Sequence, residues 1–100
     1  MDSGLAERFG RNLWLRRRRA GLTQEELARL TELHRADIGE LERGLRLPRL
    51  DTILKVSAGV EASPCVLLAG LRWRPGYYVA GDFYVEDGAG RAARPKKGAA

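Results

Sequence analysis

The chain has 100 residues, enough for one small domain, with 18 basic and 13 acidic side chains and a formal net charge of +5. The charge favours a polyanionic partner moderately, and most basic residues are Arg, which suits phosphate and guanine, although GC-rich coding explains the Arg bias equally well. One cysteine, Cys65, excludes an intramolecular disulfide, and no apolar run approaches the ~20 residues of a membrane span. The N-terminal residues lack the layout of a signal peptide, so we expect a soluble cytoplasmic protein.

The first half of the chain predicts two helices. An apolar residue at every fourth position predicts a helix over about 4–19, with Gly21 as its stop. Thr23 and Glu26 have the spacing of a capping box, so a second helix begins there and ends near Thr31. The residues expected to face the core are Leu5, Phe9 and Leu13, followed by Leu27, Ala28 and Leu30.

Three further helices are predicted. The third covers about 35–43 and stops at Gly44, and the fourth follows the loop around Pro48 and ends at Gly59. The dipeptide Ser63-Pro64 predicts the start of a fifth helix that runs to about Gly70. The residues expected to face the core are Ile38 and Leu41 in the third helix, and Leu50, Ile53 and Leu54 in the fourth.

Aromatic residues then gather in a short C-terminal segment. Tyr77–Ala80 and Phe83–Glu86 are β-prone and are separated by Gly81-Asp82, which predicts a hairpin with a two-residue turn, or else a single extended strand. We therefore divide the chain into a helical domain over 4–71, an aromatic β extension over 72–86, and a basic tail over 87–100 that we expect to be disordered. The aromatic residues are Trp73, Tyr77, Tyr78, Phe83 and Tyr84.

The second and third predicted helices have what a helix-turn-helix needs. Such a pair needs an anchored first helix, a small residue where the helices cross, and a second helix with one buried face and free N-terminal side chains. Thr23 and Glu26 supply the anchor, and Ala28 is the small residue. The side chains left outward on the second helix are Arg35, Ala36, Asp37 and Glu40.

The segments GLTQEELA (21–28), ADIGELERG (36–44) and LDTILKVSAGVEASPCVLL (50–68) together resemble the repressor/Cro-type, or XRE, helix-turn-helix domain of phage and bacterial regulators. The resemblance covers about residues 5–70. It implies a mainly α, five-helix bundle and a sequence-specific DNA-binding transcriptional regulator. Such a regulator binds a two-fold operator as a dimer, with the third helix in the major groove.

The resemblance also implies roles for individual residues. Gln24 would bind a phosphate, the outward residues of the third helix would face base edges, and Arg43 and Arg49 would lie near the DNA backbone. Glu42 matches a position that pairs with an Arg of the first helix, here Arg17, while other members of the cluster 16–19 approach phosphate. The candidates for the DNA-binding site are Gln24, Arg35, Ala36, Asp37, Glu40, Arg43, Arg49 and Arg17.

The helix pair is acidic, which is unfavourable for DNA. Residues 23–44 hold three cations and six anions. An internal pair for Glu42 would still leave Asp37 and Glu40 exposed, either to accept from cytosine N4 or simply to be solvated. Two departures from the family pattern affect the turn: Glu32 stands where Gly is usual and would adopt a left-handed conformation, and His34 replaces the usual Ser or Thr cap.

Two functions are compatible with the sequence. A single His and a single Cys give no catalytic constellation and no metal site, so we expect a non-enzyme without a cofactor. For a DNA-binding regulator, the aromatic segment 73–86 would form a homodimer with the same segment of a second chain, or pack on Trp14 and Leu15. For an antitoxin or adaptor, the same segment would bind a protein partner.

Overall fold

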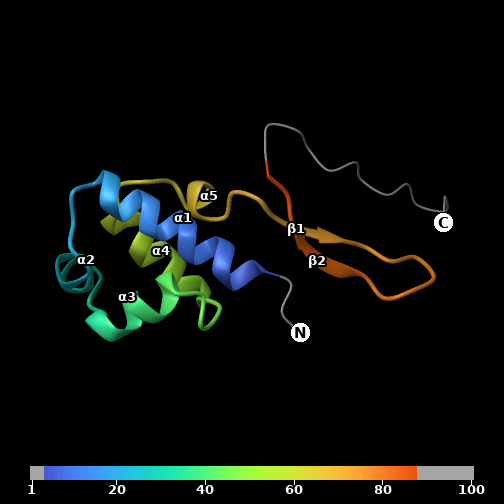
Figure 1. Ribbon diagram of the computed structural model, residues 1–100, viewed down its shortest axis with the longest axis horizontal. Coiled ribbons are helices and arrows are strands. Elements are labelled where there is room, and N and C mark those ends of the chain that lie inside the picture. The colour runs from blue at the N-terminus through green and yellow to red at the C-terminus, as the bar shows by residue number, and fades with distance from the viewer. Residues whose placement is uncertain (1–3, 88–100) are drawn as a thin grey trace.

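The computed structural model describes residues 4–87, as five helices followed by a two-stranded antiparallel hairpin (Figure 1). The prediction of a mainly α five-helix bundle with a short β extension is confirmed. Within the described residues, no helix is long and apolar enough to span a bilayer. The elements are α1 Leu5–Arg19, α2 Gln24–Thr31, α3 Arg35–Glu42, α4 Leu50–Gly59, α5 Pro64–Leu67, β1 Leu71–Arg74 and β2 Asp82–Val85.

One hydrophobic core holds the helices together. α1 packs on α3 and α5, while α2 packs on both α3 and α4. At eight residues each, α2 and α3 are too short to be stable alone, so their helical state depends on this packing. The buried apolar residues are Phe9, Leu13, Leu27, Ala28, Ile38, Leu41, Val56, Val60 and Leu67.

The turn between α2 and α3 has the predicted backbone conformation. Glu32 has φ 59° and ψ 36°, the left-handed region in which a residue with a side chain costs about 1 kcal/mol more than Gly. The N–H of Leu33 donates to the carbonyl of Ala28 at 3.0 Å and so satisfies one of the last carbonyls of α2. The chain therefore makes the helix-turn-helix turn without a glycine at that position.

A main-chain contact sets the distance between α1 and α3. A Cβ atom built at Gly10 would lie 2.3 Å from the carbonyl oxygen of Leu41 and 2.6 Å from that of Glu42. No side chain fits there, so the α1 backbone lies directly on the last turn of α3. This role of Gly10 was not predicted from the sequence, where Gly10 belongs to no motif.

Several predicted core positions are wrong. Leu30 is 62% exposed, and in α4 Leu50 and Leu54 are 74% and 52% exposed. The buried residues of α4 are instead Val56 and Ser57, with Ile53 partly buried beside them and Val60 buried directly after the helix. In a helix of 3.6 residues per turn, Leu50 and Leu54 lie to one side of this buried face and therefore point away from the core.

The fifth helix is shorter than predicted. It ends at Leu67 rather than near Gly70, and the three residues that follow form a turn. Gly70, with φ 89°, redirects the chain into β1. Leu71, which directly follows this glycine, is the first residue of β1 and also packs against the helical core.

The hairpin exists, but its first strand and its turn were predicted wrongly. Residues 71–74 form β1, whereas the segment Tyr77–Ala80 lies in the loop between the strands. Leu71 and Trp73 alternate with arginines in a period-two pattern, which is the signal of a half-exposed strand. Pro75 ends the strand because it has no N–H to donate. The predicted disorder of the tail concerns residues that, apart from Asp87, lie outside those the structure describes.

The base of the hairpin is fixed to the start of α1. The N–H of Glu86 donates to the carbonyl of Gly70 at 2.8 Å, and Arg8 forms an ion pair with Asp87. In Figure 1 the hairpin extends from the end of the bundle opposite α2 and α3. Trp14, the alternative intramolecular partner of the aromatic segment, is covered on one side by Arg18 of its own helix, 5.0 Å from the ring centroid.

The fold predicts a sharp contrast between two large-to-small substitutions. Ile38→Ala opens a cavity under the third helix and should lower the free energy of unfolding by about 2–4 kcal/mol. Leu54→Ala removes an exposed side chain of similar size and should change it by less than about 0.5 kcal/mol. Urea unfolding followed by circular dichroism measures both, and equal losses would contradict this assignment of the core.

Candidate nucleic-acid interface

The N-terminus of α2 is held by a reciprocal pair of hydrogen bonds. The Thr23 hydroxyl accepts from the N–H of Glu26 at 3.0 Å, and the Glu26 carboxylate accepts from the N–H of Thr23 at 2.8 Å. The bond from the Thr23 N–H, followed by that with the Thr23 side chain, lowers the pKa of Glu26 below its ordinary value. The predicted capping box is confirmed, and it orients the first turn of α2.

A buried ion pair joins α1 to the end of α3. Arg17 Nε lies 2.5 Å from Glu42 Oε2, and Arg17 Nη2 lies 3.0 Å from Oε1. Arg17 Nη1 also donates to the carbonyl of Leu22 at 2.8 Å. The two paired side chains are only 9% and 4% exposed. The predicted pairing is confirmed, and the same burial removes Arg17 from the surface that could contact DNA.

Gln24, the first residue of α2, also joins this cluster. Its Nε2 donates to Glu42 Oε1 at 3.0 Å, so the Glu42 carboxylate accepts hydrogen bonds from residues of both α1 and α2. A phosphate contact was predicted for Gln24, whereas this internal partner was not. The bond fixes the orientation of a side chain that remains only partly buried.

Arg35 at the start of α3 and Arg43 directly after its end are both unpaired within residues 4–87. Arg35 and Ala36 are exposed on its first turn, and within residues 4–87 the Arg35 side chain has no ion pair or hydrogen bond. Arg43 follows the helix, and its guanidinium lies over Gly39, where a Cβ atom would come within 3.2 Å of Nη1 and 3.8 Å of Gln24 Oε1. Gly39, to which the sequence analysis assigned no role, thus lets Arg43 lie close to α3 and Gln24.

The two remaining acids of α3 are both paired with Arg46. Asp37 Oδ1 lies 3.1 Å from Arg46 Nη2, and Glu40 Oε1 lies 3.1 Å from Arg46 Nε. Asp37 also accepts, through Oδ2, from the N–H of His34 at 3.0 Å, which is the contribution of the third helical residue to a capping box. Arg46 was not predicted from the sequence, because it follows α3 in an irregular segment and carries no motif.

Arg49 lies at the N-cap of α4 and is largely exposed, with Asp51 3.5 Å away. It makes no side-chain cap bond to the start of α4. The ion pairs of Asp37, Glu40 and Glu42 change the charge expected at the surface of α3. The three carboxylates of α3 all face guanidinium groups, and the unpaired charges on its exposed side are positive.

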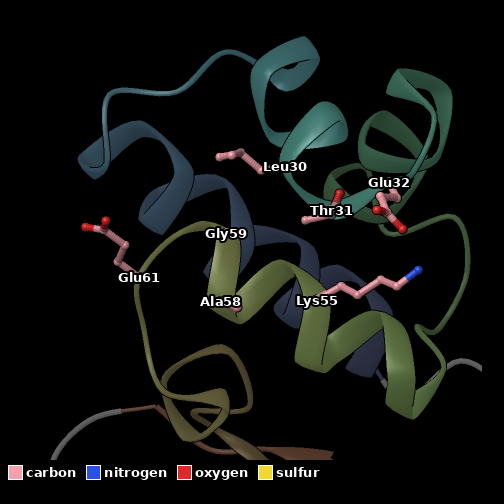
Figure 2. A pocket seen from close by; sticks show the side chains of 7 residues that line it. All are labelled: Leu30, Thr31, Glu32, Lys55, Ala58, Gly59 and Glu61. Carbon is pink, nitrogen blue, oxygen red and sulfur yellow. The ribbon is translucent and has the colours of Figure 1, made fainter.

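A shallow hollow lies elsewhere, between the end of α2 and α4 (Figure 2). None of the DNA-binding candidates lines it, so it is separate from the outer face of α3. The residues that line the hollow are Leu30, Thr31, Glu32, Lys55, Ala58, Gly59 and Glu61.

Comparisons with known proteins agree with this geometry. The family described as "Helix-turn-helix domain" matches residues 8–69. The restriction-modification controller protein C.AhdI from Aeromonas hydrophila is 39% identical over 62% of this chain and 94% of its own, with a TM-score of 0.60. The clp gene regulator ClgR from C. glutamicum is 30% identical over 64% and 83% of the two chains, with a TM-score of 0.61.

A third similar structure is the P22 c2 repressor in complex with a synthetic operator. It is 26% identical over 62% of this chain and 94% of its own, with a TM-score of 0.58. The comparison with curated proteins gave no match.

Because the Arg17–Glu42 pair is buried, removing one partner should lower the free energy of unfolding more than replacing both partners with apolar residues. Glu42→Ala leaves the Arg17 charge buried without a carboxylate and should lower the free energy of unfolding by about 3–5 kcal/mol. The double variant Arg17→Met with Glu42→Leu removes both charges and should lose much less. Chemical denaturation of the three proteins tests this, and a double variant as unstable as Glu42→Ala would show that the charge itself is not the cause.

Proposed function

Because the chain belongs to the helix-turn-helix domain family, we propose that it is a transcriptional regulator that binds a two-fold DNA operator as a homodimer. In this proposal α3 lies in the major groove, and the protein acts in the cytoplasm as a binding protein rather than an enzyme. The observation that carries the proposal is the first turn of α3, where Arg35 and Ala36 are exposed. The opposite side of the helix is buried in the core through Ile38 and Leu41. The repressor–operator complex among the similar structures supports it.

The exposed residues have distinct uses in a major groove. Arg35 has a free guanidinium, which can donate two hydrogen bonds to guanine O6 and N7. Ala36 presents a methyl group that suits the methyl group of thymine. Arg43 and Arg49 are further from that turn and suit phosphates, which position the protein without reading sequence. Gln24 adds a polar side chain at the start of α2, where backbone N–H groups also favour a phosphate.

Binding to DNA should separate the two kinds of arginine. Arg35→Ala should weaken binding to a selected site by about 1–3 kcal/mol more than binding to random duplex DNA. Arg49→Ala should weaken both alike, because phosphates are present in every sequence. Fluorescence anisotropy at several salt concentrations measures this, with a log–log salt slope of about −4 to −8 for the wild-type dimer.

Equal losses on both DNAs for Arg35→Ala would make Arg35 a phosphate contact and contradict its role in base reading. An affinity that does not change with salt would contradict the proposed DNA binding as a whole, because neutralised phosphates release counterions.

The hairpin supports the dimer part of the proposal. Trp73 and Phe83 face each other across the strands with ring centroids 4.7 Å apart, yet they are 52% and 51% exposed. An isolated two-stranded sheet is marginal, and aromatic rings of this size gain by further burial. Both sheet edges lack a neighbouring strand within the described chain. A second copy offers the same apolar face and the same edges, which fits a two-fold contact.

The charged side chains on the opposite face of the hairpin already have partners within the hairpin. Arg74 pairs with Asp82 at 2.9 Å and lies 4.5 Å from the ring centroid of Tyr84. The bond from Arg74 lowers the pKa of Asp82 below its ordinary value. Arg72 lies 3.5 Å from Glu86. Charges on this face are therefore balanced internally, and the apolar face is the one left for association.

Association should depend on the two paired rings, Trp73 and Phe83. The full-length double variant Trp73→Ser with Phe83→Ser should shift the protein from dimer to monomer in sedimentation velocity, because it removes the apolar face. Tyr78→Ser is the control: Tyr78 is 79% exposed in the hairpin loop, and its loss should leave the dimer intact.

A double variant that dimerises as strongly as wild type would place the interface elsewhere. A wild-type chain that is monomeric at tens of micromolar would favour the alternative function, in which residues 73–86 bind a different protein, as in an antitoxin or adaptor.

A further inference from the structure

We propose that Arg46 strengthens the binding of α3 to DNA by neutralising the two carboxylates that would otherwise face the phosphates. The inference rests on the proposed function and adds to it a residue with no motif of its own. Its basis is that a single guanidinium contacts both exposed acids of α3, Asp37 and Glu40.

The two acids are placed to share one partner. Asp37 and Glu40 are three residues apart, which puts them on the same face of the helix. After α3 the chain turns back at Gly44, with φ 73°, and the N–H of Leu45 donates to the carbonyl of Glu40 at 3.0 Å. This turn returns the next residue, Arg46, to the side of α3, where its Nε and Nη2 reach different carboxylates.

The cluster matters more for binding than for folding. All three side chains are partly exposed, and ion pairs at such positions stabilise a fold only weakly. At a DNA surface the same carboxylates would lose water and face the phosphate charges. With Arg46 in place, part of their hydration is already replaced by guanidinium N–H groups. The cost of bringing α3 against DNA is therefore lowered before the complex forms.

The same geometry separates this role from that of the other arginines. Arg43 makes no ion pair within residues 4–87, and its guanidinium is free to contact a phosphate directly. Arg46 is held by two carboxylates, so its effect on DNA binding passes through them. Removal of the acids should therefore remove most of the effect of Arg46, and it should leave the effect of Arg43 unchanged.

A mutant cycle on the full-length chain tests this. Affinity for a random duplex is measured for wild type, Arg46→Ala, the pair Asp37→Asn with Glu40→Gln, and the triple variant. Asn at position 37 keeps an oxygen that can cap α3. We expect Arg46→Ala to weaken binding about tenfold or more in the wild-type background. In the background without the acids, the loss should fall to within about threefold.

Two controls complete the experiment. Arg43→Ala is measured in both backgrounds and should lose the same factor in each. Arg46→Lys keeps the charge but offers one ammonium in place of a two-sided guanidinium, so its affinity should lie between those of wild type and Arg46→Ala. Melting temperatures close to wild type show that each variant is folded.

A loss for Arg46→Ala that is equal in the two backgrounds would make Arg46 an ordinary phosphate contact and overturn the inference. No loss in either background would overturn it as well. These outcomes leave the proposed function intact, because the wild-type chain still binds DNA. A wild-type chain that binds no duplex would instead defeat the proposed function, and the inference with it.

Discussion

The interaction between Arg17 and Glu42 holds α3 in place. Both side chains are almost completely buried, and a buried charge is tolerated only if its partner and its hydrogen bonds are present. Arg17 comes from the last turn of α1, Glu42 from the last turn of α3, and Gln24 from the first turn of α2. One carboxylate therefore joins three helices through hydrogen bonds.

The acidity of the helix pair is resolved by partners from outside it. Counted along the chain, residues 23–44 carry twice as many anions as cations. In three dimensions, Arg17 arrives from the preceding helix and Arg46 from the following loop, and each neutralises carboxylates of α3. Net charge over a sequence window is thus a poor measure of the potential at a surface, because ion pairs need not lie within the window.

The starts of the helices could be predicted because local chemistry determines them. The hydrogen bonds of Thr23 with Glu26, and of Ser63 with the N–H of Cys65, involve residues at most three apart. The left-handed Glu32 and the pairing of Glu42 followed from a resemblance whose positions could be matched one by one. These features do not depend on how distant segments pack.

Other features depend on the packing, and there the sequence was insufficient. Leu54 has the spacing of a core residue, but the rotation of α4 against α2 decides which of its apolar residues are buried. The β-prone aromatic residues around Tyr77 led to the prediction of the first strand at Tyr77–Ala80, which lies in the loop. In the structure, the residues that pair with β2 are Leu71–Arg74. Arg46 could not be foreseen, because its two partners lie six and nine residues away across a turn.

The contact at Gly10 has a consequence for redesign. The backbone of α1 at Gly10 contacts the backbone of α3 directly, so the packing of α3 on α1 does not depend on any outward side chain of α3. The buried side chains of Ile38 and Leu41 complete this packing on the inner face of the helix. Arg35 and Ala36 take no part in it, so other residues can replace them without moving the helix. The domain thus positions α3 independently of its two exposed first-turn residues, so substitutions at these two positions could change what this surface binds while the scaffold stays unchanged.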